Sequence, residues 1–240
     1  MKAMVFAAGL GTRLRPYTND RPKALVEVQG KTLLEIVLRR LQSFGVEEVV
    51  VNVHHFADKV IAHLKEQENL GLQIHISDER DLLLDTGGGL KKTAHLLSDA
   101  PFLIHNVDIL SNLDLRQLYA AHQPGENLST LAVRQRETSR YLEFSAEGEL
   151  CGWKNKKTGE RKISKEQARV LDWAYSGIAV IDPALFAFFP ENKAVFSIIE
   201  VWLAAAKKGI IRNFPHDATK WLDVGKPAAL ERAAREFNFD

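Results

Sequence analysis

Apolar and polar positions follow two different periods along the first half of the chain. Short, nearly continuous apolar runs, typical of buried parallel strands, occupy residues 3–8, 48–53, 73–77 and 101–106. Between them, a spacing of three and four residues predicts helices over 32–44, 57–68 and 90–97. Strands that alternate with helices predict βαβ units and a parallel sheet, whose ligands bind at the carboxyl ends of the strands. The opening loop, a predicted turn at Thr86-Gly87-Gly88-Gly89 and Asn106-Val107-Asp108 all fall at such ends.

The second half of the chain has a less regular pattern. We expect strands over 129–136, 141–145, 149–153 and 170–181, which pair in antiparallel fashion, and helices over 196–207 and 226–239. The predicted class is therefore α/β: a mixed, mostly parallel sheet with helices on both faces, and a small antiparallel subdomain. No linker or repeat interrupts the pattern, so a single domain over 1–240 is expected.

Composition excludes several kinds of protein. A net charge of +1 argues against binding of nucleic acid or membranes through bulk charge, and no apolar run is long enough for a membrane helix. Cys151 is the only cysteine, which excludes an internal disulfide and a cysteine zinc cluster. The first ten residues lack the order of a signal peptide, so we expect a cytoplasmic protein, either a monomer or a homodimer.

The loop after the first strand is related to two phosphate-binding motifs and matches neither. Gly9-Leu10-Gly11 begins a dinucleotide fingerprint, but Leu14 stands where its third glycine belongs. Gly30-Lys31-Thr32 ends like a P-loop, but Leu25 replaces the first glycine of that motif. The second match is better explained as a turn, with Thr32 near the start of a helix.

What remains is a loop of small residues followed by cations. Small side chains let a backbone approach an anion closely and direct its N–H groups at it, and they stand at Ala7, Ala8, Gly9 and Gly11. Arg13 offers a planar fork and Lys23 a compact charge, both suited to phosphate. Two aspartates, Asp108 and Asp223, each lie next to apolar residues that can present a carboxylate rigidly, and Mg²⁺ favours such ligands.

These residues resemble the signature of the sugar-phosphate nucleotidyltransferases, usually written G-x-G-T-R-L-x-P with P-K after a short gap. Further landmarks of that family occur in the family order, at Thr86-Gly87-Gly88, Asn106-Val107-Asp108, Tyr175-Ser176-Gly177-Ile178 and Trp221-Leu222-Asp223-Val224-Gly225-Lys226-Pro227. The resemblance implies a Rossmann-like fold, with a nucleotide-binding half over 1–125 and a sugar-phosphate-binding half over 126–240. The antiparallel subdomain is then expected on the substrate side.

The resemblance also implies roles for individual residues. Catalysis is assigned to Arg13, Lys23 and Asp108, and binding of Mg²⁺ to Asp108 and Asp223. Nucleotide binding is assigned to Ala7, Ala8, Gly9, Gly11, Thr12, Arg13, Lys23, Thr86, Gly87 and Gly88. Binding of the sugar phosphate is assigned to Asn106, Ser176 and Gly177. One departure from the pattern is Val107, since the family has Asn-Gly-Asp and valine does not readily adopt the positive φ open to glycine.

The implied reaction joins a nucleoside triphosphate to a sugar 1-phosphate and releases pyrophosphate. The motifs are most similar to those of single-domain N-acetylmuramate 1-phosphate uridylyltransferases of cell-wall recycling. Guanylyltransferases for mannose 1-phosphate or heptose 1-phosphate remain an alternative, as does a catalytically silent module that binds nucleotide or sugar. Residues 154–169 hold seven Lys or Arg against two Glu, which favours a solvated loop over a lid that meets an anionic substrate.

Overall fold

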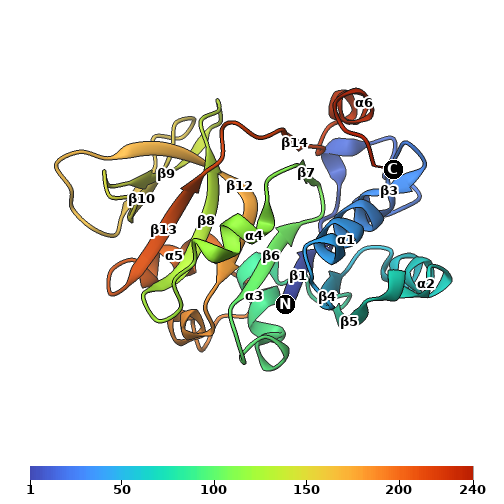
Figure 1. The fold of residues 1–240 in the computed structure, drawn as a ribbon, viewed down its shortest axis with the longest axis horizontal. Helices are drawn as coiled ribbons and strands as arrows, with labels where there is room; N and C mark the ends of the chain where they lie inside the picture. The colour runs from blue at the N-terminus through green and yellow to red at the C-terminus, as the bar shows by residue number, and fades with distance from the viewer. Residues whose placement is uncertain (240) are drawn as a thin grey trace. The chain divides into compact units, whose positions relative to one another are not determined.

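The computed structural model describes residues 1–239, so the last residue of the predicted 1–240 domain lies outside the described part. The chain divides into two compact units that interleave along the sequence (Figure 1). Unit 1 contains residues 1–83, 104–113 and the segment from 219 onward, and unit 2 contains residues 84–103 and 114–218. Among the helices of residues 1–239, none combines the length and apolar character that spanning a bilayer requires.

Unit 1 is built on parallel strands, as the apolar runs predict. β1 (Lys2–Phe6) pairs in parallel with β4 (Glu48–Val53), and β4 pairs in parallel with β5 (Gln73–Asp78). Residues 104–106 of β6 (Phe102–Asn106) extend the order to β6-β1-β4-β5. β1 buries its three central residues and β4 buries all but its first, which explains their apolar sequences.

The helices of unit 1 begin and end close to the predicted residues. α1 (Leu33–Ser43) is capped by Thr32, whose side chain accepts a hydrogen bond from the Glu35 backbone N–H at 3.1 Å. This confirms that Gly30-Lys31-Thr32 is the approach to a helix and not part of a P-loop. α2 covers Ala57–Glu66, and the amphipathic α6 covers Pro227–Glu236.

Two short ladders complete unit 1. The first joins β2 (Glu27–Val28) to β3 (Lys31–Thr32). The second joins β7 (Ile109–Ser111) to β14 (Trp221–Asp223) in antiparallel fashion. The second ladder pairs segments that flank residues 114–218 of unit 2 in the sequence, and strands of three residues are too short to show a detectable pattern.

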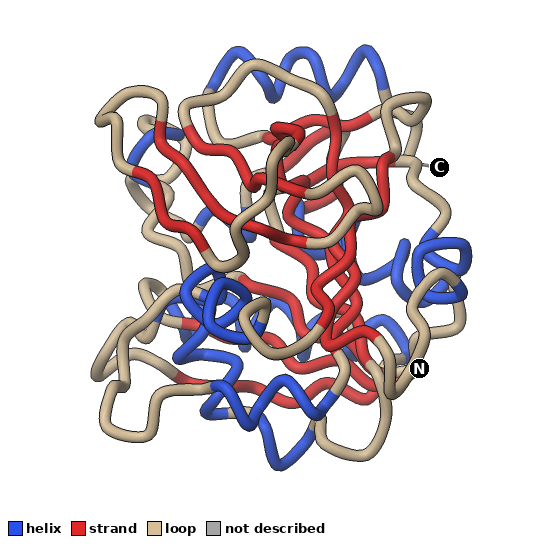
Figure 2. Tube along the Cα trace, turned by 90° about the vertical axis from the view of Figure 1, so that its left-hand side faces the viewer, coloured by secondary structure: helices blue, strands red, loops and turns tan. Residues whose placement is uncertain are grey.

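Unit 2 holds the antiparallel strands that the second half of the sequence predicts. Its strand order is β11-β10-β9-β12, from Arg161–Ile163, Leu150–Asn155, Arg140–Phe144 and Leu171–Ile181. β8 (Asn127–Arg134) pairs antiparallel with β12 and parallel with β13 (Ile210–Pro215). Its helices include α4 (Leu115–Ala120) and α5 (Ile198–Ala205). The predicted α/β class with a mixed sheet and small antiparallel sheets is thus confirmed, whereas β13 and α4 were not predicted; Figure 2 separates these strands from the helices.

The basic segment 154–169 is not simply a solvated loop. Its beginning belongs to β10, and β11 folds back along β10 with Lys154 opposite Arg161. Lys154 Nζ lies 2.7 Å from an oxygen of Asp172, and Arg161 Nε lies 2.7 Å from Glu143, a carboxylate that is only 2% exposed. The segment thus continues the sheet, and carboxylates on β9 and β12 of the same sheet pair with its cations, which the charge pattern alone did not indicate.

Thr86 and the glycines at 87–89 lie within a helix, where the sequence predicted a turn. α3 covers Asp85–Lys92, and Gly87, Gly88 and Gly89 are buried in it. The backbone N–H groups of Gly87 and Gly88 donate to the carbonyl oxygen of Phe196, at 2.9 and 3.2 Å. A Cβ at Gly88 would overlap the Ala194 carbonyl oxygen, and one at Gly87 would lie 2.5 Å from the Phe196 ring. The glycines therefore permit a close helix contact that outweighs their low helix propensity.

This contact predicts that Gly88→Ala destabilises the protein even though alanine favours helices. The added methyl group forces α3 away from the Ala194 carbonyl, and such overpacking costs about 1–3 kcal/mol of unfolding free energy. Urea denaturation measures this loss. Lys65→Ala, at an exposed position of α2, is the control and should change the unfolding free energy far less. A Gly88→Ala protein as stable as the control would contradict the close contact.

Candidate functional site

The residues that follow β1 are fixed by a buried polar network. The backbone N–H groups of Ala7 and Ala8 donate to Asn52 Oδ1, at 2.7 and 3.3 Å. Asn52 Nδ2 in turn donates to Glu79 Oε1 at 2.8 Å. Asn52 and Glu79 are 3% and 2% exposed, so water competes little with these bonds. The two N–H groups, which the sequence analysis directed at a ligand, therefore serve to hold the loop in place.

The glycines of the loop have different surroundings. Gly11 adopts a φ of 64°, and a Cβ there would lie 3.0 Å from the Thr18 side chain and 3.1 Å from Lys23 Cβ. Thr18 Oγ1 also donates to the Gly11 carbonyl at 2.9 Å. Gly9 is exposed, and the nearest atom to a Cβ there would be Lys23 Cε at 3.9 Å. Gly11 thus shapes the turn before Thr12–Leu14, while Gly9 leaves open space beside the lysine.

Lys23 and Asp108 form an ion pair across unit 1. Lys23 starts a short 3-10 helix directly after Pro22, and Asp108 follows the carboxyl end of β6. The Lys23 ammonium donates to Asp108 Oδ2, and the two side chains are only 14% and 12% exposed. Partial burial strengthens such a pair relative to one on the surface. The structure thus brings two predicted catalytic residues into direct contact.

Asp223 stands beside Asp108 because of the β7–β14 ladder. Its ladder partner is Ile109, the residue after Asp108, and the Val224 N–H donates to the Asp108 carbonyl at 2.9 Å. Burial first, and then the negative charge of Asp108, raise the pKa of Asp223 above its ordinary value. The fold therefore forces two carboxylates together at an energetic cost, as is common at sites that bind cations.

Arg13 lies near Asp223, and the absence of a side chain at Gly225 makes this approach possible. A Cβ at Gly225 would lie 2.7 Å from Asp223 Oδ1 and 2.9 Å from Arg13 Nη2, so glycine leaves both side chains room. The Gly225 N–H donates to Asp223 Oδ1 at 2.8 Å. Arg13 and Lys23 also act on the pKa of Asp223, lowering it by less than burial and Asp108 raise it. Gly225 lies within the predicted Trp221–Pro227 motif, and its role follows only from these tertiary contacts.

The paired aspartates suit a divalent cation. Mg²⁺ takes hard oxygen ligands and is commonly held by one or two carboxylates together with phosphate oxygens and water. Asp108 and Asp223 provide such a pair, and a cation held by these carboxylates would offset the burial and the repulsion that raise the pKa of Asp223. Within residues 1–239, no group of three or more His, Cys, Asp or Glu side chains is arranged to hold a metal alone. The donor set therefore fits a cation that shares its ligands with a phosphate.

Val107 fits the turn where glycine is usual. Its φ is not positive, its side chain is 1% exposed, and its N–H donates to the Phe6 carbonyl at 3.2 Å. The turn before Asp108 thus requires no left-handed residue, and valine adds apolar packing beneath the carboxylate. The departure from the familiar pattern therefore introduces no left-handed residue before Asp108.

The remaining predicted residues are divided between the units. Asn106 ends β6 in unit 1, whereas Thr86, Gly87, Gly88, Ser176 and Gly177 belong to unit 2. The Thr86 hydroxyl accepts from the Ile198 N–H at 3.0 Å. Ser176 is fully buried, and its Oγ lies 2.7 Å from His216 Nε2, while Gly177 has a φ of 79°. Their roles toward nucleotide and sugar stay predictions.

Asn52 and Glu79 were not found by the sequence analysis. The available signal was one polar residue, Asn52, within the otherwise apolar stretch of β4. Its partner Glu79 lies just after β5, so only the pairing of β4 with β5 shows that the two side chains meet. The Asn52 side chain positions the loop after β1 by accepting hydrogen bonds from two successive N–H groups. A sequence motif does not reveal such a contact, because its two partners are far apart in the chain.

The sequence is similar to a known protein family and to named enzymes. A family model described as "Nucleotidyl transferase" matches residues 2–238. The chain is 38% identical to the N-acetylmuramate alpha-1-phosphate uridylyltransferase of Caulobacter vibrioides, over 95% of this chain and 93% of that protein. It is also 38% identical to the enzyme of the same name from Neisseria meningitidis, over 97% and 96%.

The fold has solved counterparts as well. A crystal structure of a UDP-glucose pyrophosphorylase complexed with UDP-glucose superposes with a TM-score of 0.75, covering 98% of this chain and 97% of that one. At 17% sequence identity this likeness concerns the fold alone.

The Asn52 network predicts that Asn52→Ala lowers both stability and activity. The substitution leaves the Ala7 and Ala8 N–H groups and the Glu79 carboxyl without their buried partner, at a cost of about 1–3 kcal/mol. Urea denaturation measures the stability, and turnover is measured on the fraction that remains folded. Asn192→Ala makes the same chemical change at an exposed position and should leave both quantities unchanged. Normal turnover in a destabilised Asn52→Ala protein would refute the positioning role.

Proposed function

Because the chain belongs to the nucleotidyl transferase family, we propose that it joins UTP to N-acetylmuramate 1-phosphate, forming UDP-N-acetylmuramate and pyrophosphate. The two relatives of that name support the choice of substrates, since each is matched over nearly its whole length. One observation in the structure carries the proposal. Arg13 and Lys23 gather around Asp108 and Asp223 beyond the carboxyl end of β6, where their positive charges can meet the phosphates of the substrates.

The proposed reaction requires positioning and charge more than proton transfer. An oxygen of the sugar 1-phosphate attacks the α-phosphorus of UTP, the new P–O bond forms, and the bond from that phosphorus to the bridging oxygen breaks as pyrophosphate departs. The attacking phosphate is already ionised at neutral pH, so no general base is needed. The protein must hold the two phosphates in line and offset the negative charge that they bring together.

The signature loop and its cations supply this electrostatic environment. Gly9 leaves room for a phosphate beside Lys23. Arg13 lies near Asp223, in space that a side chain at position 225 would fill. We assign the triphosphate to Arg13 and the α-phosphate to Lys23, whose ammonium can contact it from its place beside Asp108. Mg²⁺ bound by Asp108 and Asp223 would supply further positive charge for the phosphate oxygens.

Recognition of the nucleoside and the sugar is assigned to residues outside this cluster. Thr86, Gly87 and Gly88 are proposed to serve the nucleobase and ribose, and Asn106, Ser176 and Gly177 the sugar phosphate. In unit 2, the close contacts of α3 and the buried bond between Ser176 and His216 give these residues fixed positions. A rigid scaffold of this kind favours recognition, because a displacement of the ligand by 1 Å is costly for the reaction.

A pyrophosphate-release assay tests the proposal. Each of the four common nucleoside triphosphates is combined with N-acetylmuramate 1-phosphate, mannose 1-phosphate, heptose 1-phosphate or glucose 1-phosphate, with and without Mg²⁺. We expect release only with UTP and N-acetylmuramate 1-phosphate, and only with the metal. A preference for GTP with mannose or heptose 1-phosphate would replace the proposed substrates. Binding of UTP without release for any pair would instead identify a silent binding module.

Asp223→Asn is predicted to raise the stability of the protein and to lower its turnover. Since folding raises the pKa of Asp223, the charged carboxylate disfavours the folded state at neutral pH, and a neutral amide of the same size removes that penalty. We therefore expect a higher urea midpoint in metal-free buffer. Turnover should fall about a hundredfold or more, because the amide weakens the proposed metal site.

Two further variants complete this test. Asp108→Asn should lower turnover similarly but without the gain in stability, since it also removes the partner of Lys23. Asp81→Asn, at an exposed position of unit 1, is the matched control and should change neither quantity. Wild-type turnover in Asp223→Asn would remove that residue from the proposed metal site.

A further inference from the structure

The strand β12 of unit 2 is irregular at two of the residues that we assign to the sugar phosphate. β12 pairs regularly with β8 up to Tyr175 and again from Ala179 onward. Between these points, three residues of β12, at 176–178, face a single residue of β8. Gly177 stands at the centre of this bulge with a φ of 79°, which glycine adopts without strain. Bulges of this kind re-aim a strand and often lie beside functional sites.

The side chain of Ser176 in this bulge points into the protein. Ser176 is fully buried, and its hydroxyl oxygen lies 2.7 Å from His216 Nε2. His216 is only 4% exposed, so water competes little with the bond. A hydroxyl enclosed in this way is out of reach of a ligand in solution. Contact between the bulge and a sugar phosphate would therefore involve the backbone of residues 176–178 and not the Ser176 hydroxyl.

His216 reaches the bulge from the other side of β8. It directly follows β13, and its backbone N–H donates to the Val133 carbonyl of β8 at 3.0 Å. β8 lies between β13 and β12 in the sheet, as Figure 1 shows. The His216 imidazole thus links two strands that are not neighbours. Val133 is also the partner of Tyr175, so His216 is anchored at the point where the bulge begins.

The two ends of the bulge are held by other contacts. Arg136 Nη2 donates to the Tyr175 carbonyl at 3.3 Å, and the Tyr175 ring packs edge-on against Trp202, with centroids 5.0 Å apart. At the other end, Ile178 is fully buried. The bond from His216 therefore acts on the middle of the bulge, next to the glycine whose backbone has the greatest conformational freedom.

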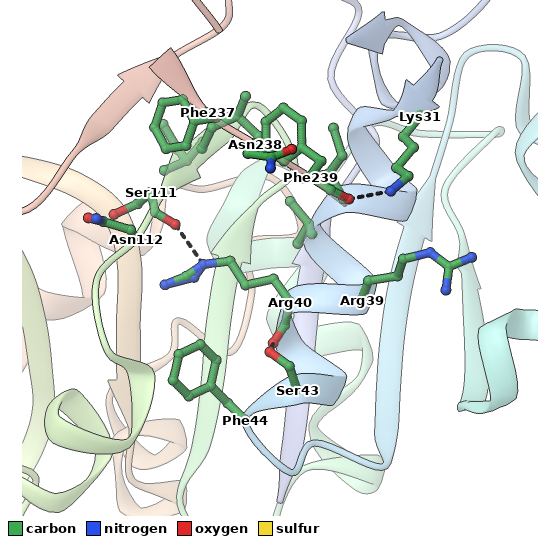
Figure 3. A pocket seen from close by; sticks show the side chains of 14 residues that line it. Lys31, Arg39, Arg40, Ser43, Phe44, Ser111, Asn112, Phe237, Asn238 and Phe239 are labelled. Atoms are coloured by element: carbon green, nitrogen blue, oxygen red, sulfur yellow. Dashed lines mark hydrogen bonds between the residues drawn. The ribbon is translucent and has the colours of Figure 1, made fainter. Parts of the chain in front are cut away.

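Polar bonds in unit 1 show a different arrangement. Arg40 extends from α1 and donates to the Ser111 carbonyl at 2.7 Å, and Lys31 donates to the Phe239 carbonyl, beside a cavity that these residues line (Figure 3). Both acceptors are backbone groups, so these bonds attach whole segments to α1 and to the residues before it. His216 instead bonds a side chain within a bulge, where it restrains a local conformation.

We propose that His216 is a positioning residue for recognition of the sugar phosphate. By holding Ser176 from across β8, it fixes the backbone of the bulge and thereby the direction of Gly177. The inference rests on the proposed function, in which Ser176 and Gly177 serve the sugar phosphate. It gives the Ser176 hydroxyl the role of an attachment point and assigns a role to a residue outside the sequence motifs.

Amide hydrogen exchange tests whether His216 fixes the bulge, and it needs no turnover. In full-length His216→Ala and Ser176→Ala proteins, we expect the amides of residues 175–179 to exchange about tenfold faster than in the wild type, as measured by mass spectrometry. The control is His122→Ala, which breaks another buried histidine–hydroxyl bond of unit 2, from His122 Nδ1 to Thr130 Oγ1 at 3.0 Å. It should leave these amides unchanged. Wild-type exchange in both His216→Ala and Ser176→Ala would overturn the proposal.

Steady-state kinetics test the consequence for the substrates. His216→Ala and Ser176→Ala should each raise KM for N-acetylmuramate 1-phosphate about tenfold, with kcat and KM for UTP within about twofold of the wild type. The amide nitrogen of glutamine can take the place of the imidazole Nε2, so His216→Gln should restore KM to within about threefold. The double variant His216→Ala/Ser176→Ala should be no worse than either single variant, because both remove the same bond.

The results distinguish a positioning role from a loss of stability. Equal rises in KM for UTP and for the sugar phosphate, or the same rise in His122→Ala, would overturn the proposal. If His216→Ala does not fold, Ser176→Ala, which removes a single hydroxyl, is used for both measurements. A wild-type protein that turns over no pair of substrates would refute the proposed function, and hydrogen exchange would still decide whether His216 holds the bulge.

Discussion

The juxtaposition of Asp108 and Asp223 is the constraint around which unit 1 is arranged. Two partly buried carboxylates repel each other, and the raised pKa of Asp223 shows that the fold opposes its ionisation. The β7–β14 ladder and the bond from Val224 to Asp108 keep them together nonetheless. Lys23 and Arg13 offset part of the repulsion, and Gly225 gives the arginine access. The site is therefore prepared for positive charge before any ligand arrives.

Sequence analysis was most successful where a local pattern determines the outcome. The buried strands and α1 follow directly from apolar periodicity and from the cap at Thr32. The signature loop was identified because its residues are contiguous and ordered. Lys23, Asp108 and Asp223 were named individually, and the structure brings them together within one unit.

Features that depend on tertiary contacts were missed or misplaced. Residues 86–89 were expected to form a turn, but hydrogen bonds to the Phe196 carbonyl and the close approach of Ala194 favour glycines inside α3. The role of Asn52 is visible only in the structure, where the pairing of β4 with β5 places Asn52 Nδ2 2.8 Å from Glu79 Oε1. β13 was overlooked because its inward pattern is interrupted by Arg212 and Asn213, which the neighbouring β8 accommodates. In each case the decisive partner is distant in the sequence.

The interleaving of the two units has a consequence for biosynthesis. Asp108 is translated before residues 114–218 of unit 2, and Asp223 only after them. On the ribosome, unit 2 can therefore acquire all of its strands while β7 still lacks its partner β14. The pairing that places the two carboxylates side by side has to wait for the last segment of unit 1. The nascent chain is thus spared the repulsion between Asp108 and Asp223 until the remainder of the sheet can support it.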